Sequence, residues 1–380
     1  MKRIYWRPQK VSRIELIVIA LISLALLVAV ETLQITEVQP WHAEKLEASR
    51  LARRAMEQIR LERERLDLEI DLTTDPTGSG LIGVAMSEVT TNTGHIDSKQ
   101  TTINPNFAAV VVHYLKKAGV EAGDVVAVGC SGSFPALNVA VYAALQTLKA
   151  EPVIIASVSG SQWGANDPRL MWPDMEKLLL DKGLFTFRSV AASRGGIEDR
   201  ALGITRDGRQ KLDAVIERSG VLAIKPKDYA QSVADRMAVY TERAGDRPVK
   251  AYVNVGGGTT SVGTRVGKQL FRPGLNRSAP AGLGDVDSVM SRFIHQGTPV
   301  IHLVKIPELA RRFGLPLQPT EMPKVGDGEI FARRAHNRWL AGLAVVLIVG
   351  LLYGFIRRDL GLRMLKGLGR RSPGAPEPMV

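Results

Sequence analysis

Five short apolar runs, rich in β-branched residues and separated by segments of helical length, constrain the fold of this chain most strongly. The runs lie at 125–128, 152–158, 184–190, 249–255 and 299–304. The segments long enough for helices lie at 134–149, 172–182, 206–219, 227–244 and 286–295. Short strands that alternate with helices are typical of a parallel sheet covered on both faces. We therefore predict an α/β fold with a mostly parallel sheet, in a Rossmann-like three-layer arrangement.

Each end of the chain carries an apolar stretch, Leu16–Val30 and Leu340–Ile356. With their flanking residues these stretches predict transmembrane helices at 14–35 and 338–357. Most of the net charge of +12 lies in two basic tails, 1–13 and 358–380. By the positive-inside rule, both tails are expected in the cytoplasm and the large domain outside, at the plasma membrane. The lipid bilayer is then a partner, and the charge needs no nucleic acid to explain it.

Between the two stretches the composition changes twice. Residues 36–72 hold a predicted juxtamembrane amphipathic helix, at about Trp41 to Asp67, with an apolar stripe and an arginine-rich face formed by Arg50, Arg53, Arg54, Arg60 and Arg63. The segment from Thr73 to Asn106 is polar and poor in strands, as functional loops often are. We expect residues 73–335 to form the extracytoplasmic α/β domain, with its regular core starting near Phe107.

Four polar, glycine-rich loops follow four of the predicted strands. Ligands of open parallel sheets bind beyond the carboxyl ends of the strands, so these loops are expected to converge on one donor-lined cleft. The candidate ligand-binding residues are Gly129, Ser131, Gly132, Ser133, Ser161, Gln162, Trp163, Asn166, Ser193, Arg194, Asn254, Gly256, Gly257, Gly258, Thr259 and Thr260.

The first loop resembles a nucleophile elbow, because a strand, a glycine, a serine and a helix follow one another. Ser131 is the candidate nucleophile, with His295 or His302 as possible bases, but Ser133 occupies the position of the usual last glycine. The same residues also suit a helix start, with Ser133 as the N-cap and Pro135 in the first turn. A third use is the binding of an anionic or carbonyl oxygen by backbone amides of this loop.

The other chemical motifs predict no cofactor. The string Gly256–Thr260 resembles the phosphate loop of actin-like ATPases, but Asn254 does not supply the expected acid, so a tight turn or an oxyanion-type pocket is the better interpretation. The six histidines show no metal-ligand spacing, and no metal is expected. The single cysteine, Cys130, is typical of a small buried apolar residue.

Four strings of the sequence resemble the poly-γ-glutamate system protein family. They are Gly129–Asn138, Ser161–Pro168, Ser189–Gly203 and Val253–Gly263. Members of this family are accessory proteins encoded beside the poly-γ-glutamate synthase and export components of bacteria. The resemblance implies a role in making, exporting or processing this capsule-like polyanion. It assigns a catalytic role to no residue of this chain.

Three hypotheses follow. The first is a membrane-anchored module that binds or guides poly-γ-glutamate or its precursor, where loop donors and Arg188, Arg194 and Arg200 contact polymer carboxylates and amides. The second is a hydrolase or transferase that acts on the polymer through Ser131. The third is a scaffold whose arginine-rich helix holds other subunits of the synthase and export complex.

Overall fold

The computed structural model describes residues 13–284 and 286–358. The chain divides into two units, residues 38–332 and a terminal unit formed by 1–37 with 333–380. The helices are α1 (Arg13–Thr32), α2 (His42–Arg65), α3 (Ile96–Thr102), α4 (Phe107–Ala118), α5 (Pro135–Leu148), α6 (Trp172–Asp181), α7 (Arg206–Ser219), α8 (Tyr229–Ala244), α9 (Thr259–Val262), α10 (Thr264–Leu270), α11 (Val289–His295), α12 (Ile306–Arg312) and α13 (Arg338–Arg358). The strands are β1 (Ile35–Val38), β2 (Val125–Ser131), β3 (Glu151–Ser157), β4 (Asn166–Asp167), β5 (Leu170–Met171), β6 (Ala191–Ser193), β7 (Leu222–Ile224), β8 (Val249–Val255), β9 (Gly274–Asn276), β10 (Val300–Leu303) and β11 (Ala332–Ala335).

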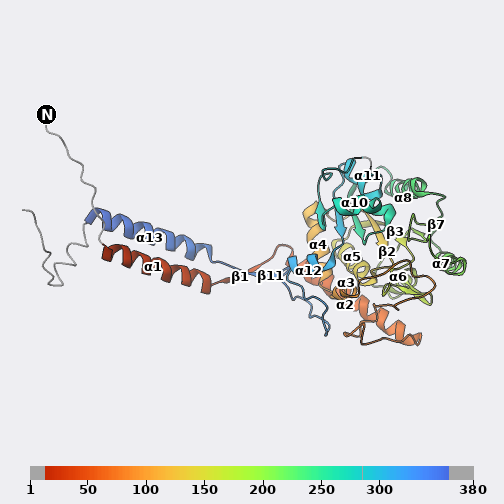
Figure 1. The fold of residues 1–380 in the computed structure, drawn as a ribbon, viewed down its shortest axis with the longest axis horizontal. Coiled ribbons are helices and arrows are strands. Elements are labelled where there is room, and N and C mark those ends of the chain that lie inside the picture. The colour runs from red at the N-terminus through yellow and green to blue at the C-terminus, as the bar shows by residue number, and fades with distance from the viewer. Residues whose placement is uncertain (1–12, 285, 359–380) are drawn as a thin grey trace, which may run out of the picture. The chain divides into compact units, whose positions relative to one another are not determined.

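The larger unit is built on a seven-stranded sheet in the order β7-β6-β3-β2-β8-β10-β9. Neighbouring strands pair in parallel except β9, which runs antiparallel to β10 at one edge. Figure 1 shows α8, α10 and α11 on one side of this sheet, with α2 and α6 on the other. The predicted α/β fold with a mostly parallel sheet and helices on both faces is confirmed for this unit.

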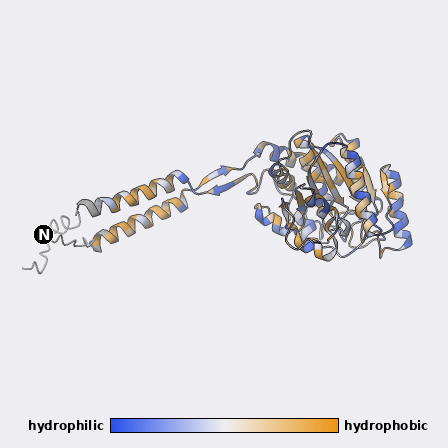
Figure 2. Cartoon of the chain, turned by 90° about the horizontal axis from the view of Figure 1, so that it is seen from above, coloured by the Kyte–Doolittle hydropathy of each residue, from blue (hydrophilic) through white to orange (hydrophobic). Residues whose placement is uncertain are grey.

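Side chains of each strand alternate between two apolar cores, as a pleated strand requires. Val126 and Val128 pack with α2, α4 and α5, whereas Val125 and Ala127 pack with α8 and α11. Figure 2 shows the resulting pattern, with hydrophobic strands inside and hydrophilic outer turns on the helices. Burial of both faces explains why the strand sequences are almost continuously apolar.

Helix ends follow local capping chemistry. Thr205 caps α7 by accepting a hydrogen bond from Gly208 N at 3.1 Å, and Asp228 caps α8 by accepting one from Gln231 N at 2.8 Å. Gly220 ends α7 in the left-handed conformation, with φ 68°. These signals explain why the predicted helix at 206–219 has the same bounds in the structure and why the helix predicted from 227 begins at Tyr229.

Most of the predicted run at 184–190 is not a strand, because Arg188 and Ser189 are hydrogen-bonded to segments outside the sheet, and only Val190 bonds to β3. Ser189 N donates to the buried Glu176 carboxylate at 3.2 Å, and Arg188 donates to Ser219 O at 2.7 Å. The strand forms directly afterwards, as β6. The sequence interpretation also missed β7, whose three residues are too few to show a periodic pattern.

Helix α2, predicted as a juxtamembrane amphipathic helix, belongs to the α/β unit. Its apolar stripe, with Ala48, Ala52, Ala55 and Ile59 fully buried, packs against α4, α5 and α6. Arg63, expected on the solvated face, is also buried, and it donates to Glu69 O at 3.1 Å. The amphipathic pattern was interpreted correctly, but the surface that it covers is the sheet-and-helix core.

The prediction of two transmembrane helices is wrong. Helices form at both expected places, as α1 and α13, and they pack against each other within the terminal unit. Among the described residues, no helix combines the length and the hydropathy that crossing a bilayer requires. The physical reason is length, since Leu16–Val30 and Leu340–Ile356 are each shorter than the about 20 apolar residues that usually span a membrane. The predicted plasma-membrane localisation, with cytoplasmic tails and an external domain, depended on these two helices and is contradicted by the same finding. The predicted basic tails fall almost wholly on 1–12 and 359–380, outside the described residues.

Candidate functional site

The strand order reverses between β2 and β8: β3, β6 and β7 lie beyond β2, whereas β10 and β9 lie beyond β8. In open α/β sheets such a reversal separates the loops that follow the two flanking strands and makes a place for a ligand. Here those loops begin at Ser131 and Gly256, which adjoin: a Cβ atom added at Gly256 would lie 3.6 Å from Ser131 Cβ. The first and fourth polar loops therefore meet at the carboxyl edge of the sheet.

The second loop joins this edge through hydrogen bonds to the first. Ala165 N donates to Gly132 O at 2.7 Å, and Ser161 N donates to Ser133 Oγ at 3.0 Å. The approach is so close that a Cβ atom at Gly132 would lie 2.4 Å from Val158 O. Glycine is required there because only hydrogen fits between the two backbones.

The third loop connects the second to the fourth. Ser159 N donates to Arg194 O at 3.0 Å, and Glu198 N donates to Thr259 Oγ1 at 3.0 Å. All four loops are thus linked by hydrogen bonds along one edge. The four loops lie together as predicted, whereas the single donor-lined cleft stays a prediction.

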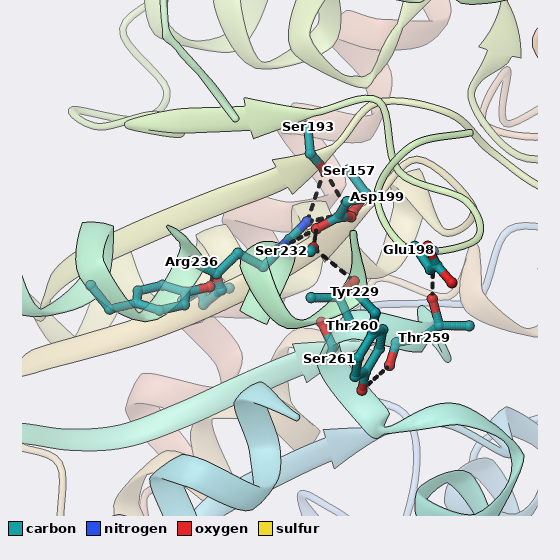
Figure 3. Close-up of polar contacts among 12 residues, drawn as sticks. Ser157, Ser193, Glu198, Asp199, Tyr229, Ser232, Arg236, Thr259, Thr260 and Ser261 are labelled. Carbon is teal, nitrogen blue, oxygen red and sulfur yellow. Dashed lines mark hydrogen bonds and ion pairs between the residues drawn. The ribbon is translucent and has the colours of Figure 1, made fainter. Parts of the chain in front are cut away.

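Beneath this edge lies a buried ion pair between Arg236 of α8 and Asp199 of the third loop (Figure 3). Arg236 Nη2 donates to Asp199 Oδ1, Ser157 Oγ and Ser193 Oγ, each at 2.9 Å. Ser232 Oγ donates to Asp199 Oδ2 at 2.7 Å. Burial by itself raises the pKa of Asp199, but the Arg236 charge and these hydrogen bonds outweigh it and hold that pKa below its ordinary value. The network ties the ends of β3 and β6 to α8.

Several of the predicted ligand-binding side chains hold neighbouring segments in place. Asn166 Nδ2 donates to Val84 O and to Thr90 Oγ1, each at 2.9 Å, and Gln162 Oε1 accepts from Gly94 N at 3.1 Å. Trp163 packs against the core, and Arg194 is paired with Asp213. Ser193 and Thr260 belong to the network of Figure 3. The long polar segment of the sequence is therefore fastened over the second loop by these contacts.

The loop positions that remain partly or fully open to solvent include Ser131, Ser133, Gly257, Gly258 and Thr259. A Cβ atom at Gly258 would meet nothing within 4 Å. Within residues 13–284 and 286–358, the N–H groups of Gly257 and Gly258 donate no hydrogen bond. This end of the edge therefore offers free backbone donors.

Among the described residues, no general base is hydrogen-bonded to Ser131. Its Oγ accepts a hydrogen bond from Ser133 N at 3.2 Å, and no histidine, lysine or carboxylate of the described chain is hydrogen-bonded to it. His302 lies on β10, two strands away from β2, where its Nδ1 is 3.0 Å from Asn254 Nδ2 and burial lowers its pKa to about 3. His295 contacts Ser291 instead, at 3.4 Å.

Cys130 is buried, and burial raises the pKa of its thiol well above the ordinary value. A protonated, enclosed thiol is a poor nucleophile. Among the described residues, no three His, Cys, Asp or Glu side chains are grouped so that they could hold a metal ion.

Lys99 is a site residue that the sequence interpretation missed. Its Nζ donates to Ser161 Oγ at 2.9 Å and to Ser133 O, and it lies 4.1 Å from the centre of the Phe134 ring. Burial lowers the pKa of this amine to about 7. No sequence signal marks it, because a lysine in a polar segment ordinarily indicates a solvated surface.

A pocket of about 480 Å³ opens beside the third loop, and it brings in a second missed group. Lys225 and Lys227 line it together with Arg194, Arg200 and Arg209. The sequence marks this pocket by the string Lys-Pro-Lys directly after a strand. That strand, β7, has three residues and is too short to be recognised from the sequence, so the string was not interpreted as part of a site.

Comparison with known proteins adds no relative to these observations. No protein-family model, no curated protein and no solved structure matches this chain. The functional inference therefore depends on the geometry of the carboxyl edge and on the resemblance of the loop sequences.

Proposed function

We propose that this chain is an accessory component of poly-γ-glutamate synthesis or export that binds or guides the polymer at the carboxyl edge of its sheet. The observation that carries the proposal is the hydrogen-bonded convergence of the four polar loops. The strings that resemble the poly-γ-glutamate system proteins contain these same loops, so the resemblance and the geometry point to one place on the molecule.

The chemistry of the edge suits this polymer. Each unit of a γ-linked glutamate chain presents one carboxylate and one amide, which accept hydrogen bonds from N–H, hydroxyl and guanidinium donors. The edge offers backbone donors at Gly257 and Gly258, hydroxyls at Ser131 and Ser133, and cations beside the third loop. An uncharged set of donors beside a cationic set can contact both parts of each unit.

The contacts of Ser131 favour binding over bond cleavage. An activated serine needs a base within hydrogen-bond reach, and the Ser131 hydroxyl has only Ser133 N as its partner in the part of the chain that the structure describes. A serine hydrolase or transferase is therefore not the function that this geometry supports best.

The test is binding of the purified full chain to fluorescently labelled γ-glutamate oligomers, measured by anisotropy at several salt concentrations. We expect binding that weakens as salt rises, because carboxylate contacts are screened. Gly258→Asp places a negative charge at an open position of the edge without steric conflict, and it should weaken binding. Thr241→Asp, an exposed position near the other end of α8, is the control and should bind like the wild type. Absence of binding by the wild-type chain would refute the proposal.

A further inference from the structure

The pocket beside the third loop lies at the carboxyl ends of β6 and β7, at the same edge as the converged loops. Ile224, the last residue of β7, lines it, and Arg194 directly follows β6. Its charged lining consists of Arg194, Asp199, Arg200, Arg209, Lys225 and Lys227. Five cations and one carboxylate therefore face a single hollow.

The single carboxylate does not neutralise this lining. Asp199 is buried and is paired with Arg236 beneath the pocket, where two serine hydroxyls also donate to it. Its charge is therefore balanced from below, and it contributes no free anion to the pocket.

Two of the five cations have ion-pair partners at the rim. Arg194 pairs with Asp213 and Arg200 with Glu198. In the described chain, no carboxylate lies within ion-pair distance of Arg209, Lys225 or Lys227; Arg209 donates to Ile204 O at 2.6 Å. These three cations thus have no ion pair of their own, and the opposing charge that acts on Lys225, the Asp213 carboxylate, is already paired with Arg194. The pocket therefore keeps an excess of positive charge, as an anion site requires.

Lys225 and Lys227 are positioned as a pair. Both are exposed and both line the pocket, with Pro226 between them. Proline restricts its own φ and favours an extended preceding residue, so the segment is stiff. In an extended segment, residues two apart lie on the same face, roughly 7 Å from each other. Two ammonium groups at this spacing suit an anion that carries more than one carboxylate.

The third loop is folded tightly around this pocket. Glu198, Asp199 and Ala201 all have positive φ values, of 57°, 59° and 53°, which side chains other than glycine rarely adopt. Ala201 N donates to Gly195 O at 2.8 Å and closes the loop on itself. The surrounding contacts therefore maintain a strained backbone conformation, as occurs at functional sites.

The pocket also adjoins the converged loops. Glu198, next to Asp199, is hydrogen-bonded to Thr259, the neighbour of Gly258 (Figure 3). An extended ligand that contacts Gly258 thus needs to follow only the third loop to reach Lys225.

We infer that this pocket is the carboxylate-binding subsite of the chain and takes neighbouring carboxylates of one anionic polymer through Arg209, Lys225 and Lys227. The inference depends on the proposed function, since it names the residues that recognise the charge of the polymer. The uncharged loop donors then contact the amide groups of the same strand.

The experiment compares two double variants of the full chain, using labelled γ-glutamate oligomers as the probe. Lys225→Ala/Lys227→Ala removes two pocket charges that form no ion pair, and we expect about tenfold weaker binding with a shallower dependence on salt. Arg243→Ala/Lys250→Ala removes the same charge at exposed positions near the opposite edge of the sheet and should bind like the wild type. Unchanged thermal unfolding of both variants would show that the fold is intact.

The outcomes separate the two proposals. If the wild-type chain binds no oligomer, the proposed function fails. If the wild type binds and the Lys225/Lys227 variant binds equally well, the function stands and the pocket is not the subsite. If both double variants weaken binding equally, the effect is one of net charge, and the subsite is again refuted.

Discussion

Arg236 and Asp199 form an ion pair in which both side chains are almost completely buried, 1% and 4% exposed, between α8 and the loop after β6. The pair joins two segments that the chain connects only through α7 and β7. Because burial removes water from both ions, each depends on the other for its charge balance. The geometry of the third loop is therefore coupled to α8.

Removing one partner of this pair should be costly. We expect Arg236→Met to lower the free energy of unfolding by about 3–5 kcal/mol, because Asp199 would remain charged and buried. Urea unfolding measures this. Arg218→Met, which removes an exposed arginine paired with Asp174, is the control and should cost about 1 kcal/mol or less. Equal effects of the two substitutions would contradict the role assigned to the buried pair.

The close approach of the first two loops predicts different responses from two glycines. Gly132→Ala should destabilise the fold by roughly 2–4 kcal/mol, since the new Cβ atom would lie 2.4 Å from a backbone oxygen. Gly258→Ala should stay within about 0.5 kcal/mol of the wild type, because its φ of −59° suits alanine and nothing lies near. Thermal unfolding of the two variants compares them directly, and a harmless Gly132→Ala would show that the loops are not in contact.

Glu176 should make stability depend on pH. Burial raises its pKa to about 7, although hydrogen bonds from Ser189 oppose the shift. Between pH 4.5 and pH 7 the folded state then holds a proton that the unfolded state has released, so the stability contributed by the neutral acid is lost as pH rises through this range. Glu176→Gln should remove this loss and gain about 2–3 kcal/mol relative to the wild type between pH 5 and pH 8. Unfolding curves across this range are the measurement, with the exposed Glu217→Gln as control; parallel pH profiles of Glu176→Gln and the wild type would disprove the assignment.

Lys99 should make stability depend on pH in the opposite direction to Glu176, and at higher pH. Burial lowers its pKa to about 7, so between pH 7 and pH 10.5 the unfolded state holds a proton that the folded state has released. Stability therefore rises with pH through this window and falls as pH returns toward 7. Lys99→Met should flatten this rise, whereas the exposed Lys182→Met should retain it. Chemical denaturation at pH 7, 8 and 9 tests this, and a rise that persists in Lys99→Met would assign it to another group.

The sequence by itself determined the layers of the α/β unit. Runs such as 249–255 are apolar on both faces, and only a sheet covered on both sides gives such runs a stable place. Capping residues such as Thr205 and Gly220 determined the bounds of α7, because their contacts are local. The convergence of the four loops also followed from the sequence, since the carboxyl ends of parallel strands meet at one edge.

Only the tertiary structure decided which polar groups are available at that edge. Asn166 and Ser193 fit a ligand site by residue type, yet distant segments use their hydrogen-bonding capacity. The structure shows that Lys225 and Lys227 form a pair, because both follow a three-residue strand and both line the same pocket. The physical reason is that burial and charge neutralisation arise from partners far apart in the chain, whereas sequence patterns report local periodicity and local caps.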